Sequence, residues 1–321
     1  MQNIITRTPF RITFTGGGSD LPHFYTKSVG AAVNATIDKY MYIFIHKSFD
    51  NTYRIRYSKE EDVTRIDDIQ HNTAREAIRL LDIKPGIEVV SLSDIPRGGT
   101  GLGSSSVYVV GLLNALHAWK GEIVSKEQLA KEAVMIEKDI LKEPCGLQDQ
   151  YAAAFGGLNL YEYTPEERVR VNPVIMKPEH LNGLQDSLML LYTGIQRNAN
   201  EILESVKKTD NFETLAKRRD MAYKHYEDLI SGRWEKTGYW ISEGWKLKKG
   251  MSEKVSNSDI DRMCEKAIDM GGDVKNIGAG GGGFLMVYAP KKKQGEIRDA
   301  LGLQEMKFNF EFNGTSIVFF N

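Results

Sequence analysis

The sequence predicts a mixed α/β fold divided into two domains, and three observations support this prediction. Up to about residue 163, short β-branched and aromatic runs alternate with helical segments. Beyond that point helices and strands occur in separate groups, which is typical of an α+β arrangement. A polar segment at residues 165–178 joins the two parts, and 321 residues are enough for two domains of ordinary size. We therefore predict one domain over residues 1–178 and an α+β domain over residues 179–321.

The elements of the first part follow from residue type and periodicity. Strands are expected at residues 10–15, 32–37, 40–46, 53–57, 87–93 and 158–163. Helices are expected at residues 72–81, 107–119 and 147–155, and from the capping box at residues 125–128 to the break at residues 144–146. The helix at residues 107–119 is apolar on nearly every side, which predicts burial between layers.

The second part begins with a strand at residues 188–193, followed by three helical segments that run to about residue 270. A glycine cluster at residues 278–283 precedes a strand at residues 284–288, and residues 291–301 predict a helix. Two closing strands, at residues 306–312 and 315–320, are expected to form a hairpin that turns at Asn313-Gly314.

The loop at residues 96–106 carries the strongest functional signal in the chain. Four glycines within residues 98–103 leave backbone amides unshielded, and three serines follow at the expected start of a helix. Amides at a helix N-terminus bind anions, so the loop predicts a polyphosphate site. It lacks the lysine of a P-loop and the third glycine of a dinucleotide loop. The alternative is an ordinary strand-to-helix turn, which needs fewer glycines.

Composition narrows the class of protein. The net charge of −1 gives no global attraction to nucleic acid or to a membrane surface. No apolar run reaches the length of a membrane-spanning helix, and the first residues do not resemble a signal peptide. The two cysteines, Cys145 and Cys264, are far apart and lack metal-ligand spacing. We expect a cytoplasmic protein with neither a nucleic-acid nor a membrane partner, and we leave open whether it forms a homodimer.

Several motifs together resemble the GHMP kinases, the superfamily of galactokinase, homoserine kinase and mevalonate kinase. They occur in order along nearly the whole chain, at residues 8–12, 16–22, 37–40, 96–106, 144–157, 192–197 and 278–283. Within the superfamily the chain is most similar to the bacterial D-glycero-D-manno-heptose 7-phosphate kinases. The resemblance implies an N-terminal S5-like α/β domain, a C-terminal ferredoxin-like α+β domain, and an active site in the cleft between them.

The resemblance also implies ATP as donor and Mg²⁺ as its cation. The ATP-binding residues would be Pro96, Gly98, Gly99, Gly101, Leu102, Gly103, Ser104, Ser105 and Ser106. Ser104 or Ser105, together with Glu137, would hold the magnesium ion, since Mg²⁺ prefers oxygen ligands. Glu137 could instead be a surface ion-pair partner.

Asp149 matches the aspartate that faces the acceptor hydroxyl in the family, and Arg11 matches the cation beside it. Asp149 would act as a base or orient the hydroxyl, although a carboxylate at this position could merely stabilise a helix N-terminus. The substrate-binding residues would be Gly17, Gly18, Ser19, Asp20, Lys39, Arg197, Gly280 and Gly281, with Arg197, Lys39 and Arg97 as candidates for binding a sugar phosphate.

We therefore expect a kinase that phosphorylates the C1 hydroxyl of D-glycero-D-manno-heptose 7-phosphate, for nucleotide-activated heptose synthesis. Glycines 17 and 18 replace the Glu-His pair of galactokinases, which argues against galactose and leaves room for a larger or phosphorylated sugar. The alternatives are another sugar, such as fucose, galactose or a hexosamine, and a non-catalytic nucleotide-binding regulator. Retention of Asp149, Arg11 and Glu137 together argues against the regulator.

Overall fold

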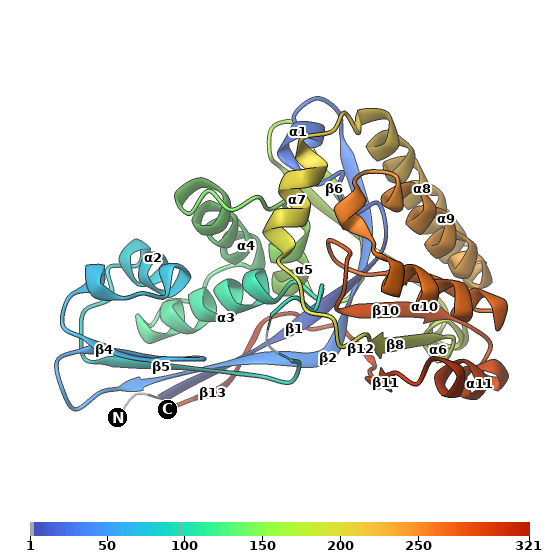
Figure 1. The fold of residues 1–321 in the computed structure, drawn as a ribbon. Helices are drawn as coiled ribbons and strands as arrows, with labels where there is room; N and C mark the ends of the chain where they lie inside the picture. The colour runs from blue at the N-terminus through green and yellow to red at the C-terminus, as the bar shows by residue number, and fades with distance from the viewer. Residues whose placement is uncertain (1–2, 97) are drawn as a thin grey trace.

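The computed structural model describes residues 3–96 and 98–321, and its elements form two sheets with helices packed against both (Figure 1). The larger sheet has nine strands within the described residues. They are β1 (Asn3–Thr15), β2 (Gly30–Lys47), β3 (Tyr53–Arg56), β4 (Glu60–Val63), β5 (Ile87–Ser93), β6 (Leu158–Tyr163), β7 (Val169–Pro173), β12 (Phe310–Glu311) and β13 (Ser316–Phe320).

Two long antiparallel strands, β1 and β2, connect the two ends of this sheet. The second half of β2 pairs with β5, and its first half pairs with β6. The β1–β2 register shifts between Pro9 and Phe10 and again between Thr13 and Thr15, which bends the pair. The strands predicted at residues 32–37 and 40–46 are therefore one continuous, bent strand. Because β1 runs through both ends of the sheet, its C-terminal residues reach the region between the two halves of the molecule.

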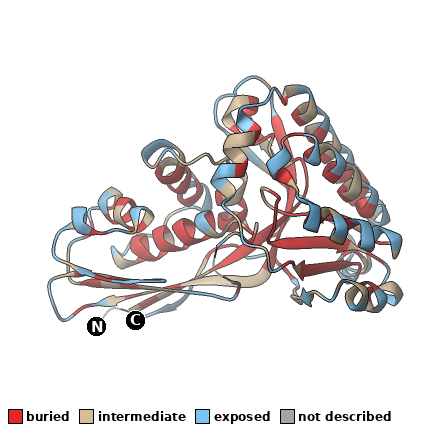
Figure 2. Ribbon diagram, in the orientation of Figure 1, coloured by how far each residue is buried: buried red, intermediate tan, exposed pale blue. Residues whose placement is uncertain are grey.

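The helices of the first half cover one face of the large sheet (Figure 1). They are α2 (Asn72–Leu80), α3 (Ser104–Trp119), α4 (Lys126–Val134), the π-helix η2 (Met135–Ile140) and α5 (Gln148–Phe155), with the 3-10 turn η1 (Ile66–Asp68) before them. Helix α3 packs on β1 and β2 and also contacts α2, α4 and α5. Its residues from Ser106 to Leu113 are all buried, which confirms the predicted burial between layers (Figure 2).

The second sheet has the strand order β11-β8-β10-β9, and each strand runs antiparallel to its neighbour. Its strands are β8 (Leu188–Tyr192), β9 (Asp273–Asn276), β10 (Phe284–Tyr288) and β11 (Gln304–Glu305). The remaining helices are α1 (Pro22–Tyr25), α6 (Pro178–Asp186), α7 (Ala199–Lys207), α8 (Phe212–Ile230), η3 (Trp234–Lys236), α9 (Thr237–Lys249), η4 (Glu253–Val255), α10 (Ser258–Asp269) and α11 (Lys291–Leu301). Helices α8 and α9 also contact β1, so they connect the second half to the large sheet.

The predicted hairpin at Asn313-Gly314 is wrong. Strand β12 pairs with β2, and β13 pairs with β1 at the edge of the large sheet. The backbone of Gly314 is packed against the end of α5 so closely that a Cβ would overlap Ala154, and Thr315 N donates to Ala153 O at 2.9 Å. Pairing of β12 and β13 with the long strands β2 and β1 therefore outweighs the local turn signal. The division of the chain into two domains at residue 178 stays a prediction. Strands β12 and β13, which the prediction assigned to the second domain, pair with strands of the first sheet.

Across residues 3–96 and 98–321, no helix combines the length and the apolar character needed to cross a bilayer. The mixed helix and sheet architecture itself agrees with the predicted fold class.

Candidate active site

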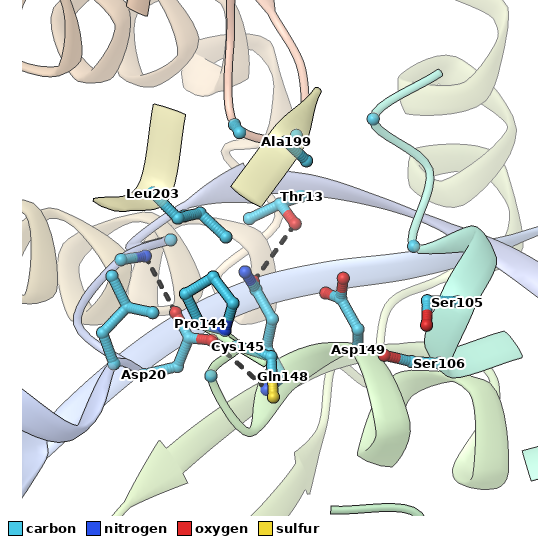
Figure 3. A pocket seen from close by; sticks show the side chains of 18 of the residues that line it. Thr13, Asp20, Ser105, Ser106, Pro144, Cys145, Gln148, Asp149, Ala199 and Leu203 are labelled. Carbon is cyan, nitrogen blue, oxygen red and sulfur yellow. Dashed lines mark hydrogen bonds between the residues drawn. The ribbon is translucent and has the colours of Figure 1, made fainter. Parts of the chain in front are cut away.

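A cavity of 380 Å³ lies where the two halves of the chain meet (Figure 3). The first half contributes the end of β1, the loop that contains Gly17 and Asp20, the glycine loop at residues 98–106 and the segment at residues 143–150. The second half contributes side chains of α7, α8 and α9 and the start of the glycine cluster at Gly278. The cavity is thus lined by most of the motifs that the sequence singled out.

The glycine loop lines one part of this cavity. Gly98, Gly99, Gly101 and Gly103 all have positive φ, and Gly103 caps α3 in the left-handed region without a side-chain hydrogen bond. The first amides of α3 therefore have no side-chain cap, as an anion site requires. A Cβ on Gly103 would lie 3.2 Å from Asp149 Oδ2, so the glycine also allows the loop to approach the aspartate.

Not every residue of the predicted ATP loop faces the cavity. Gly98, Gly99, Gly101, Gly103, Ser104, Ser105 and Ser106 line it. Leu102 is fully buried in the core, and its carbonyl accepts from Arg11 N at 3.3 Å. Pro96 is exposed and does not line the cavity. Arg97 lies outside the described residues.

Arg11 and Asp149 form a bidentate ion pair in the cavity wall. Arg11 Nε donates to Asp149 Oδ1 at 2.7 Å, and Nη2 donates to Oδ2 at 2.6 Å. The third nitrogen, Nη1, donates to Gly101 O at 2.6 Å. The guanidinium is buried, whereas a quarter of the aspartate side chain (25%) is exposed to the cavity. This geometry fixes the carboxylate beside the glycine loop while leaving it accessible to a ligand.

Glu137 is a buried carboxylate on the π-helix η2. It accepts from Ser105 Oγ at 2.5 Å, from Ser106 Oγ at 2.7 Å and from Gln150 Nε2 at 2.6 Å. Burial raises the pKa of its carboxyl, and the three hydrogen bonds partly oppose that effect. The residue is only 2% exposed, which excludes the predicted alternative of a surface ion pair.

Asp20 is the third carboxylate in the cavity wall. Burial and the charge of Asp149 raise its pKa to about 6, while the backbone amides of Gly18 and Gln148 lower it. The Gly18 amide donates at 2.8 Å and the Gln148 amide at 3.4 Å. A Cβ on Gly146 would overlap Asp20 Oδ2, so glycine is required at that position of the motif.

Several predicted substrate residues lie elsewhere. Ser19 is buried and holds its own loop through bonds to Gly16 O and Ala31 O, and Lys39 pairs with Asp38 at 3.3 Å outside the cavity. Neither side chain reaches the cavity, and the substrate-binding role of both residues stays a prediction. Gly17, Gly18 and Asp20 do line the cavity.

Gly280, Gly281 and Arg197 also lie outside the cavity lining. A Cβ on Gly280 would overlap the carbonyl of Val255, so that glycine permits close packing with a neighbouring loop. The Arg197 guanidinium lies between the glycine loop and Gly281; Nη2 donates to Ile277 O at 3.4 Å, and Nε and Nη1 have no partner among the described residues. Burial lowers its pKa to about 10.

The cavity residues that were not predicted from the sequence include three buried cations: Arg218 of α8, Lys248 of α9 and Lys275 of β9. Gln150, which holds Glu137, was predicted only as part of a motif. The sequence does not indicate which lysine of the run Trp245-Lys246-Leu247-Lys248-Lys249 is buried, because the buried and the exposed positions of this helix both carry lysine.

Comparison with known proteins shows the family. The family model described as the GHMP kinases N terminal domain matches residues 72–157. The D-glycero-alpha-D-manno-heptose 7-phosphate kinase of Campylobacter jejuni is 32% identical over 93% of this chain and 96% of its own length. The chain belongs to the GHMP kinases. It is a sugar kinase of this family, whose members use ATP as phosphoryl donor.

The fold of this GHMP kinase agrees with solved structures. A D-glycero-D-manno-heptose 1-phosphate kinase from Bacteroides thetaiotaomicron has a TM-score of 0.79 and 25% identity, and 97% of each chain is covered. Galactokinase from Lactococcus lactis has a TM-score of 0.76 at 16% identity, over 98% of this chain and 95% of that chain, which shows the shared fold alone. The predicted resemblance and mixed fold are confirmed.

Proposed function

We propose that this GHMP kinase transfers the γ-phosphoryl group of ATP to the C1 hydroxyl of D-glycero-D-manno-heptose 7-phosphate. The observation that carries the proposal is the position of the Arg11–Asp149 pair. Asp149 of this pair lies between the start of α3, at Ser105 and Ser106, and the part of the cavity that contains Asp20 (Figure 3). The similarity to a heptose 7-phosphate kinase over 93% of the chain supports the choice of acceptor.

The donor side of the proposal uses the glycine loop. The triphosphate would accept hydrogen bonds from the free amides at the start of α3 and from the serine hydroxyls beside them. Ser105 Oγ and Glu137 supply hard oxygen donors, and Glu137 has no cationic partner among the described residues, so this pair fits a magnesium ion. When bound there, the ion would neutralise charge on the phosphates.

The acceptor side uses Asp149. Its exposed carboxylate can accept the proton of the attacking hydroxyl or hold that hydroxyl in line with the γ-phosphoryl group. Arg11 fixes the carboxylate with two hydrogen bonds and adds positive charge next to the path of transfer. Asp20 and the open backbone of Gly17 and Gly18 would contact the sugar hydroxyls. These roles need no other covalent chemistry from the protein.

A coupled assay of ADP release over a panel of acceptors tests this function. The panel contains D-glycero-D-manno-heptose 7-phosphate, the unphosphorylated heptose, fucose, galactose and a hexosamine. We expect the heptose 7-phosphate to give the highest kcat/KM. Higher kcat/KM for fucose or galactose would assign another sugar, and nucleotide binding without turnover of any acceptor would favour a regulator. The position of the new phosphate on the product is read by NMR.

A further inference from the structure

Three buried cations line the cavity without forming any ion pair within the described part of the chain. Arg218 and Lys275 are each 4% exposed, and Lys248 is 8% exposed. They come from three different elements of the second half, α8, β9 and α9. Buried cations are normally paired with carboxylates, because removal of the charge from water is costly. This group, which we call the cation cluster, is therefore an exception.

The cation cluster is held by backbone carbonyls. Lys275 Nζ donates to Thr13 O at 2.8 Å and to Phe14 O at 2.9 Å. Lys248 Nζ donates to Gly278 O at 2.6 Å and to Asn276 O at 3.1 Å. These carbonyls orient both ammonium groups but carry no full negative charge.

Arg218 is held in the same way. Its Nε and Nη2 donate to Gly17 O at 3.0 and 2.8 Å, and Nη1 donates to Gly244 O at 2.6 Å. A lysine has three N–H donors and an arginine has five. Within the described chain, one ammonium hydrogen of each lysine and two guanidinium hydrogens therefore have no oxygen acceptor, although Lys248 Nζ also lies 5.4 Å from the centroid of the Trp245 ring.

The electrostatic consequence is a group of cations to which no carboxylate of the described chain is bonded. Burial, together with the neighbouring cations, holds the pKa of Lys248 and of Lys275 well below the ordinary value for lysine. Burial also lowers the pKa of Arg218 to about 10, although the charge of Asp20 raises it. Asp20 directs its oxygens to the amides of Gly18 and Gln148 and forms no ion pair with the cluster. An anion that entered the cavity would stabilise all three cations.

Two anions could enter this cavity, the phosphates of ATP and a phosphate carried by the acceptor. Lys275 and Arg218 are tied to Thr13 and Gly17, which belong to the Asp20 side of Asp149. Lys248 is tied to Gly278, whose backbone packs against Gly101 of the glycine loop, so it lies at the boundary of the two sides. Figure 3 shows Thr13 and Asp20 on one side of Asp149, with Ser105 and Ser106 on the other. The glycine loop already offers the triphosphate a separate set of donors at the start of α3. The acceptor phosphate is thus the anion that otherwise has no binding group.

We propose that Arg218, Lys248 and Lys275 form the binding site for the phosphate that the acceptor already carries. This inference rests on the proposed function and deepens it, because it makes the cluster the reason for selecting a phosphorylated sugar. It also moves the predicted phosphate site from Arg197 and Lys39, neither of which lines the cavity.

The test compares two acceptors that differ only in this phosphate. The ratio of kcat/KM for heptose 7-phosphate to kcat/KM for unphosphorylated heptose is measured for the wild type, Lys248→Met and Lys275→Met. Methionine keeps most of the side-chain volume and removes the charge. Lys246→Met is the matched control, since Lys246 lies two residues away on α9 and its side chain is 71% exposed.

We expect each cluster variant to lower the ratio by about ten- to a hundredfold, the effect of one lost charge-assisted contact. The control should keep the wild-type ratio. An unchanged ratio in both cluster variants, with equal losses on the two acceptors, would assign the cluster to ATP or to stability and overturn the proposal. A wild type with no preference for the phosphorylated acceptor would overturn it as well.

A second measurement separates this proposal from the proposed function. If the wild type phosphorylates neither heptose, the function is wrong, and binding of inorganic phosphate is then measured by calorimetry with saturating AMP-PNP on the donor side. A tenfold or greater loss of phosphate affinity in Lys248→Met, but not in Lys246→Met, would support the cluster as a phosphate site. Equal phosphate affinity in the wild type and both variants, or no binding at all, would overturn it.

Discussion

Asp20 should make this protein less stable as the pH rises from about 4 to about 6. Its carboxyl is 2% exposed, and burial and the nearby Asp149 raise its pKa from 3.8 to about 6. A shift of this size corresponds to about 3 kcal/mol. Because the folded pKa lies above the ordinary value, the native state keeps a proton that the unfolded chain has lost in this pH window. The contribution to unfolding free energy therefore falls as the pH rises and stays low above pH 6.

The substitution Asp20→Asn removes this titration with little change in shape. The asparagine oxygen can still accept from the Gly18 amide at the 2.8 Å position, while its NH₂ group faces the Gln148 amide, whose bond is already long at 3.4 Å. The lost bond should cost about 1 kcal/mol. We therefore expect the difference in unfolding free energy, variant minus wild type, to rise by up to about 3 kcal/mol between pH 4 and pH 6.5. At pH 7 the net gain should be about 2 kcal/mol.

The assay is urea denaturation of both proteins at several pH values from 4 to 7.5. The difference between the two unfolding free energies isolates Asp20, because other titrating groups contribute to both curves. A difference that stays constant over the whole range would refute the reasoning. A difference that changes in the opposite direction would show that Asp20 is stabilised as a carboxylate in the native state.

Three further substitutions test the remaining carboxylates and one glycine. Asp149→Asn should lower kcat by about 10²–10⁴-fold in the ADP-release assay, and a variant that keeps more than about a third of kcat would end the assignment of Asp149 as a base. The same substitution should lower the unfolding free energy by about 2–3 kcal/mol, because the amide NH₂ opposes a nitrogen of Arg11. Glu137→Gln should raise the Mg²⁺ concentration needed for half-maximal activity, because an amide is a poorer ligand for a hard cation; normal kcat at limiting Mg²⁺ would make the residue structural. Gly146→Ala should raise KM for the acceptor, because the new Cβ overlaps Asp20 Oδ2, whereas Gly295→Ala, in open space on α11, should be neutral or stabilising; equal acceptor KM values in the two variants would contradict the steric argument.

The fold was predictable where local sequence determines structure. The glycine loop, the buried helix α3 and the capping box of α4 follow from residue type and spacing, and Ser125 does accept from the Gln128 amide at 3.1 Å. The closing strands were not predictable in this way. Their Asn-Gly signal is local, whereas the partners of β12 and β13 are strands about 270 and 310 residues earlier in the chain.

The site was predictable to a different extent for each kind of residue. Arg11 and Asp149 are 138 residues apart, and only the family motifs suggested that they meet. The cation cluster was missed because burial of a lysine depends on tertiary packing. Lys246 and Lys248 are two residues apart in one basic helix, yet one points to solvent and the other is buried beside Gly278. No single-sequence pattern distinguishes these two positions.

The charges of the cavity explain why its residues are not those that stability alone would select. Arg11 and Asp149 satisfy one another, but Asp20 and Glu137 are buried carboxylates without a cation, and the cation cluster has no carboxylate. Separated buried charges of both signs destabilise the folded protein, and apolar replacements of similar volume would remove that cost. Under the proposed function, a metal ion would supply the partner of Glu137, the acceptor phosphate that of the cation cluster, and sugar hydroxyls would bond to Asp20. Under the proposed function, the cost of burying these charges and the affinity for a phosphorylated acceptor would have the same physical origin.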